Sequence, residues 1–141
     1  MQTPLVLEFI KENLPLVAIA VASGAVVLWQ TLRGNGRHQL SAAEATLKIN
    51  REDAVVVDVR ESSEWSSGHI PNARHIPLGQ LEKRIAELEK FKSRPLIVCC
   101  ASGNRAADAT ATLRRIGFEQ AYTLRGGIGG WVDAGLPTTG K

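Results

Sequence analysis

Short apolar runs alternate with amphipathic segments along most of this chain. Residues 54–59 (AVVVDV) and 95–100 (PLIVCC) are almost entirely apolar, which is the pattern of strands buried on both faces. Residues 121–124 (AYTL) predict a third strand, and a very short strand is expected at 74–76. Three or four short parallel strands are therefore the predicted centre of the fold.

The segments between these strands have helical features. Helices are predicted over 41–49, 78–90 and 106–116, where apolar residues recur at intervals of three and four. A single helical turn is expected after residue 62, and a short closing helix at 131–134. This alternation indicates an α/β domain with a parallel sheet between helices, whose ligand site lies beyond the carboxyl ends of the strands.

The first part of the chain has a different pattern. Residues 13–32 contain no charged side chain, and a helix of this length would span roughly 30 Å, the thickness of the hydrocarbon core of a bilayer. We predict a leader at 1–12, a transmembrane helix at 13–32, a linker at 33–38, a folded domain at 39–137 and a loose tail at 138–141.

Two other interpretations of the apolar segment stay open. The small residues around Ala20 and Ala22 resemble a signal-peptide cleavage site, although the leader lacks the basic residues of a signal peptide. A buried or interfacial helix is the third possibility. If the helix spans a membrane, Arg33 and Arg37 follow it directly, and the excess of positive charge on that side places the folded domain in the cytoplasm.

The length and charge of the chain limit the number of domains and the classes of function that it can have. The 141 residues are enough for one ordinary domain with a short appendage. The net charge of +3 comes from basic and acidic residues that are interspersed, and no basic block with interleaved aromatic residues is present. We therefore expect no nucleic-acid partner.

The two cysteines, Cys99 and Cys100, are adjacent in the sequence. Neighbouring residues of a strand point to opposite faces, so a disulfide between them would be strained. They form neither a disulfide framework nor a zinc site. This pattern suits a reducing compartment and leaves at least one thiol available for reaction.

The segment from Cys100 to Arg105 (CASGNR) stands between a predicted strand and a predicted helix. If this loop curls around the thiol, its backbone N–H groups and the start of the helix would form an anion-binding nest that stabilises a thiolate. Gly103 permits the tight backbone turn, and Arg105 could bind an anion or fix the loop. The alternative is that Cys100 is a small apolar filler, which is the role expected for Cys99.

The segment from Val98 to Ala106 (VCCASGNRA) resembles the active-site segment of rhodanese domains. Further motifs of that family accompany it in order, and together they cover about residues 41–137: VDVRE at 57–61, EW at 64–65, GHIPNA at 68–73, HIP at 75–77, GG at 126–127 with Trp131, and AGLP at 134–137.

The resemblance implies a rhodanese-like α/β sandwich around a five-stranded, mostly parallel sheet with helices on both faces. It also implies a sulfurtransferase that takes sulfane sulfur from a donor such as thiosulfate as a persulfide on Cys100 and passes it to a thiol acceptor. The amides of Ala101, Ser102, Gly103, Asn104 and Arg105 would hold the charged sulfur, without a metal or an organic cofactor. For a bacterial member, the predicted helix would make it a single-pass protein of the inner membrane.

Other residues of these motifs are expected to have structural roles. Asp58 and Arg60 would support neighbouring loops, and His69 and His75 would act as scaffolding. Trp65 and Trp131 are interpreted as packing residues. Ala101 departs from the family pattern, in which many members have a basic or polar residue, and this weakens the expected attraction for thiosulfate.

Two rival functions remain. Phosphatases and arsenate reductases of related fold use a loop with one more residue between cysteine and arginine, so the six residues of 100–105 favour sulfur chemistry. A membrane-anchored interaction module, in which sulfur transfer is secondary, is the stronger rival. The small residues Ser23, Gly24 and Ala25 could pack against the helix of a membrane-protein partner.

Overall fold

A computed structural model describes residues 3–32 and 38–140. The chain divides into two compact units, residues 1–37 and residues 38–141.

The N-terminal unit consists of two helices, α1 (Thr3–Glu12) and α2 (Leu14–Leu32). No residue of α2 is buried, and this helix of 19 residues is long and apolar enough to cross a membrane, a property that signal sequences share. Arg33 and Arg37, on which the predicted orientation rests, lie outside the described residues, as does most of the predicted linker.

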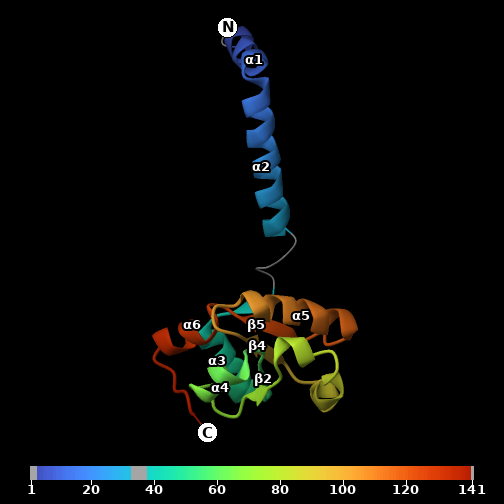
Figure 1. The fold of residues 1–141 in the computed structure, drawn as a ribbon, viewed down its shortest axis with the longest axis vertical. Coiled ribbons are helices and arrows are strands. Elements are labelled where there is room, and N and C mark those ends of the chain that lie inside the picture. The colour runs from blue at the N-terminus through green and yellow to red at the C-terminus, as the bar shows by residue number, and fades with distance from the viewer. Residues whose placement is uncertain (1–2, 33–37, 141) are drawn as a thin grey trace. The chain divides into compact units, whose positions relative to one another are not determined.

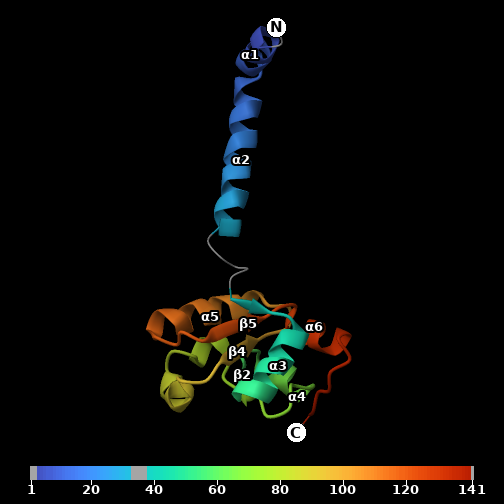
Figure 2. The same ribbon diagram turned by 180° about the vertical axis from the view of Figure 1, so that it is seen from behind.

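A five-stranded sheet forms the centre of the second unit. Figures 1 and 2 show its labelled strands β2, β4 and β5 among the helices from opposite sides. The strands stand in the order β1-β5-β4-β2-β3, and every neighbouring pair is parallel. Their bounds are β1 Gln39–Leu40, β2 Val55–Asp58, β3 Arg74–His75, β4 Leu96–Cys99 and β5 Ala121–Leu124. The predicted α/β fold is confirmed. The sequence did not indicate β1, because two residues are too short to form a pattern.

Helices cover both faces of the sheet. Because successive strand residues point to opposite sides, each strand contributes to two separate cores. Val55 and Val57 belong to a core shared with α5 (Asn104–Ile116) and with the 3₁₀ segments, whereas Val56 belongs to a second core with α3 (Ala42–Glu52) and α6 (Gly127–Asp133). Cys100 lies in the first core and Cys99 in the second. The expectation that the two cysteines face opposite sides is therefore confirmed.

Two predicted helices were wrong in form or extent. Instead of one helix over 78–90, the chain has two 3₁₀ segments, η1 (Leu78–Gln80) and η2 (Ile85–Phe91). The apolar residues of this region recur at intervals of three as well as four, and an interval of three also fits a three-residue turn. The closing helix α6 begins at Gly127, four residues earlier than expected, and follows an N-cap, Gly126, with a positive φ of 74°.

The C-terminal tail was predicted to be loose, and this was also wrong. The backbone of Thr139 forms an antiparallel bridge with His69, in which the N–H of each residue donates to the carbonyl of the other at 2.8 Å. The tail is thus bound to the loop that follows α4 (Ser62–Ser66).

Candidate active site

The carboxyl ends of the parallel strands bring the predicted site residues to one edge of the sheet. Asp58 ends β2 and pairs in register with Cys99, the last residue of β4, so that Cys100 is the first residue beyond its strand. The N–H of Val59 donates to the carbonyl of Cys99 at 3.0 Å and extends this alignment.

The thiol of Cys100 is enclosed by the backbone of its own loop. Cys100 is 1% exposed, and its Sγ accepts hydrogen bonds from the N–H of Gly103 at 2.9 Å and from that of Ala106 at 3.4 Å. Gly103 is the N-cap of α5 with a φ of 108°, a conformation that favours glycine. Around this buried sulfur, Ala101, Ser102 and Asn104 are exposed. The arrangement can stabilise a negatively charged sulfur through backbone donors.

The N-terminal end of helix α6 contacts the backbone of the loop. The N–H of Ile128 donates to the carbonyl of Cys100 at 2.8 Å, and that of Gly129 to the carbonyl of Ala101 at 3.4 Å. A Cβ atom on Gly127 would collide with the Cys100 carbonyl oxygen and would lie 2.7 Å from the carbonyl carbon of Ala101. Sequence reasoning placed Gly127 in a family motif without giving it this role; only the contact between two distant segments reveals it.

Arg105 does not extend into the loop but reaches α4. Its Nη1 and Nη2 donate to Oε1 and Oε2 of Glu64 at 2.7 and 2.9 Å. The hydrogen bond from Arg105 is the main cause that lowers the pKa of the Glu64 carboxyl from 4.5 to about 2, and the same pairing raises the pKa of Arg105. Of the two roles considered for Arg105, this geometry fits fixing the loop. Glu64 was not among the predicted site residues.

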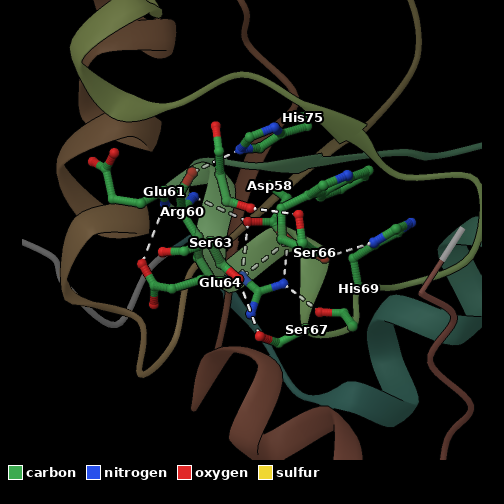
Figure 3. A network of polar contacts seen from close by, with 12 residues as sticks. Asp58, Arg60, Glu61, Ser63, Glu64, Ser66, Ser67, His69 and His75 are labelled. Carbon is green, nitrogen blue, oxygen red and sulfur yellow. Dashed lines mark hydrogen bonds and ion pairs between the residues drawn. The ribbon is translucent and has the colours of Figure 1, made fainter.

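Asp58 and Arg60 form a second bidentate pair, which is buried (Figure 3). Arg60 Nη2 donates to Asp58 Oδ2 at 2.8 Å and to the carbonyl of Gly68 at 2.7 Å. Burial alone would lower the pKa of Arg60, but the hydrogen bonds and the charge of Asp58 outweigh it and raise that pKa. This pair ties β2 to the loop after α4, which agrees with the supporting role proposed for both residues.

An aromatic stack fills the space beside that pair. The ring of Trp65 lies between two imidazoles, with centroid distances of 3.5 Å to His69 and 4.8 Å to His75. The imidazole of His75 is hydrogen-bonded through Nε2 to the carbonyl of Arg60 at 2.8 Å, and that of His69 through Nδ1 to the carbonyl of Trp65 at 3.0 Å (Figure 3). Such contacts with backbone carbonyls are those of scaffolding residues.

The chemical environment of Cys99 differs from that of Cys100. Burial, and secondarily the charge of Asp58, raises the pKa of the Cys99 thiol well above its ordinary value. Cys99 is therefore a neutral core thiol. Within residues 3–32 and 38–140, no group of three or more His, Cys, Asp or Glu side chains is arranged to hold a metal ion.

Known proteins resemble this chain in sequence and in fold. Residues 41–134 match the model of the rhodanese-like domain. The uncharacterized protein YibN of Escherichia coli K12 is 32% identical over 136 residues, covering 94% of each chain. That match leaves only 6% of this chain unmatched, fewer residues than the 19 of α2, so it extends into the N-terminal helices.

A sulfurtransferase and a solved structure give further similarity. A protein of Allochromatium vinosum named a sulfurtransferase is 37% identical over 86 residues, which cover 61% of this chain and 78% of that protein. The crystal structure of a rhodanese-related protein from Thermoplasma volcanium superimposes with a TM-score of 0.66 at 33% identity, covering 74% of this chain and 99% of the other.

Substitution of Gly127 by alanine tests the support of the loop. We expect Gly127→Ala to destabilise the fold by at least about 1–3 kcal/mol, because the residue has a positive φ and its Cβ would collide with the loop backbone. Gly129→Ala in the same helix is the control, because its Cβ meets only the Ala101 carbonyl at 3.7 Å. Urea unfolding of both variants measures the difference, and equal stabilities would contradict this role of Gly127.

The ion pair of Glu64 predicts a pH dependence of stability. Because the pKa of Glu64 is depressed in the folded state, its stabilisation is fully present above pH 4.5 and is lost as the pH falls toward about 2. We expect the difference in urea midpoint between the wild type and Glu64→Gln to be constant near neutral pH and to shrink across that interval. A difference that does not depend on pH would show that the charge of Glu64 does not contribute.

Proposed function

The chain belongs to the rhodanese-like domain family, and we propose that it is a sulfurtransferase that carries sulfane sulfur as a persulfide on Cys100. The observation that supports this most directly is the cradle around the Cys100 sulfur, in which two backbone N–H groups donate to Sγ. The relative from Allochromatium vinosum that is named a sulfurtransferase supports the same reaction class.

The first step forms the persulfide. The thiolate of Cys100 attacks the outer sulfur of a donor such as thiosulfate, the donor's S–S bond breaks, and sulfite leaves with the electron pair. Hydrogen bonds from the Gly103 and Ala106 amides stabilise the attacking thiolate. We expect the amides of the exposed loop residues Ala101, Ser102 and Asn104 to hold the negative charge of the outer sulfur.

The second step returns the enzyme to its starting state. An acceptor thiolate attacks the outer sulfur of the persulfide, the Cys100 S–S bond breaks, and the acceptor leaves as a persulfide. Cys100 departs as a thiolate, which is the form that the cradle stabilises. Both steps are attacks of a thiolate on a sulfur atom, so as written they use neither a metal nor an organic cofactor.

Intact mass spectrometry tests the persulfide directly. We expect the full-length protein in detergent to gain the mass of one sulfur atom after thiosulfate treatment and to lose it with a reductant. Cys99→Ala should retain the adduct, and Cys100→Ser should abolish it. Absence of an adduct with thiosulfate and with a second sulfane donor, or an adduct that persists in Cys100→Ser, would overturn the proposal.

We further propose that α2 anchors the protein in the bacterial inner membrane with the catalytic domain in the cytoplasm. The 19 uncharged residues of α2 give a span of about 29 Å, close to the thickness of the hydrocarbon core. The sequence places Arg33 and Arg37 on the side of the catalytic domain. A domain with an available thiol also suits a reducing compartment.

Fractionation of cells tests this placement. The full chain should stay in the membrane fraction after alkaline carbonate extraction, and a version lacking residues 1–38 should be soluble. Protease added to spheroplasts should leave the catalytic domain intact. A mature N-terminus close to Ala22, or digestion of the domain from outside, would contradict the proposed topology.

A further inference from the structure

The loop around Cys100 carries little charge of its own. Ala101, Ser102, Gly103 and Asn104 have uncharged side chains, so Arg105 is the one cation of the loop. The local field that an incoming anionic donor meets therefore depends on the state of Arg105.

Glu64 cancels the charge of Arg105. The guanidinium is held in a two-point pair with Glu64 at 2.7 and 2.9 Å, and the two side chains are 34% and 32% exposed. Glu64 is itself positioned from the other side, since its Oε1 accepts the N–H of Glu61 at 3.2 Å. A carboxylate held by two partners in this way keeps the arginine neutralised and away from the loop.

The charged residues of β2 and α4 beside this pair are paired or negative. Arg60 is neutralised by Asp58, and Glu61 at the start of α4 is exposed and unmatched by a further cation of this group. The charged residues of the two ion pairs and of the N-cap of α4, Asp58, Arg60, Glu61, Glu64 and Arg105, comprise three negative and two positive charges. Arg125 follows β5 between Leu124 and Gly126, whose backbone atoms lie 3.7 and 3.8 Å from the position of a Cβ on Gly103, and its Nε donates to Oε1 of Gln39 on β1 at 3.4 Å.

We propose that Glu64 determines which donor charge the site favours. By neutralising Arg105, it makes the site favour sulfane donors with one negative charge, such as thiosulfonates, over the thiosulfate dianion. This rests on the proposed sulfur transfer to Cys100 and adds its substrate class. Glu64 is a specificity-determining residue here and takes no part in bond making.

Two donors with the same scissile bond isolate the effect of charge. Thiosulfate transfers its outer sulfur to the Cys100 thiolate and releases sulfite, and methanethiosulfonate does the same and releases methanesulfinate. In both reactions the donor's S–S bond breaks, the electron pair leaves with the released anion, and the Cys100 persulfide is formed. The donors differ in carrying two negative charges or one.

The decisive experiment compares persulfide formation on the full-length wild type and Glu64→Gln. Glutamine keeps an acceptor oxygen for Arg105 and for the Glu61 amide but removes the negative charge. We expect the second-order rate constant to rise about fivefold with thiosulfate and about twofold with methanethiosulfonate, since the interaction energy is proportional to donor charge and is screened at this exposure. The intrinsic reactivities of the donors cancel in each ratio of variant to wild type.

Glu87→Gln is the matched control. Glu87 pairs with Arg84 at 2.6 Å in another exposed Glu–Arg pair, outside the loop and α4. It removes the same charge from the molecule and should leave both rate constants unchanged. In the double variant Glu64→Gln, Arg105→Gln, the gain with thiosulfate should disappear, and circular dichroism checks that each variant is folded.

The outcomes separate this inference from the proposed function. Equal factors for the two donors in Glu64→Gln, a fall in both rates, or the same gain in Glu87→Gln would overturn the role of Glu64 while sulfur transfer stands. If neither donor forms an adduct on Cys100 in any variant, the sulfur-transfer proposal itself fails.

Discussion

The hydrogen bonds from backbone amides to the sulfur of Cys100 are the interaction on which the proposed chemistry of this domain depends. Cys100 is 1% exposed, so water cannot solvate a charge on its sulfur from all sides. A buried charge without polar partners is strongly unfavourable, and the Gly103 and Ala106 amides provide those partners. The positive φ of Gly103 and the missing Cβ of Gly127 both follow from this requirement, because the loop must turn sharply and be supported closely from behind.

Two arginine–carboxylate pairs hold the elements around this cradle. Asp58 and Arg60 join β2 to the loop after α4, and Glu64 and Arg105 join α4 to the start of α5. Between them, Trp65 is stacked on both histidines. Each arginine is paired with a neighbouring carboxylate. The pairs that hold the elements together therefore also neutralise the positive charge of both arginines. Structural support and the proposed discrimination against a dianionic donor thus have the same cause.

Much of this architecture could be predicted from local sequence. The runs around β2 and β4 are apolar on both faces because both faces are covered, and the motif order indicated the fold. Local pattern did not distinguish the 3₁₀ segments η1 and η2 from a helix, because their apolar spacing fits both. The roles of Glu64 and Gly127 were missed for a different reason. Glu64 lies 41 residues from Arg105, and Gly127 contacts a loop that ends more than twenty residues earlier, so only the folded chain brings them together.

Backbone groups and side chains have different roles in the proposed site. The backbone holds the charged sulfur, and the side chains affect which donor reacts. The cradle is built from amides, which every residue except proline provides, so the ability to hold a charged sulfur depends on the loop's conformation and on the glycines that permit it. In the proposed function, the choice of donor depends on side chains at the exposed edge of the loop, where Ala101 and Ser102 are small and Arg105 is paired with Glu64. A change at this edge can therefore alter which donor reacts without altering the reaction, whereas a change behind the loop, as at Gly127, affects the reaction with every donor.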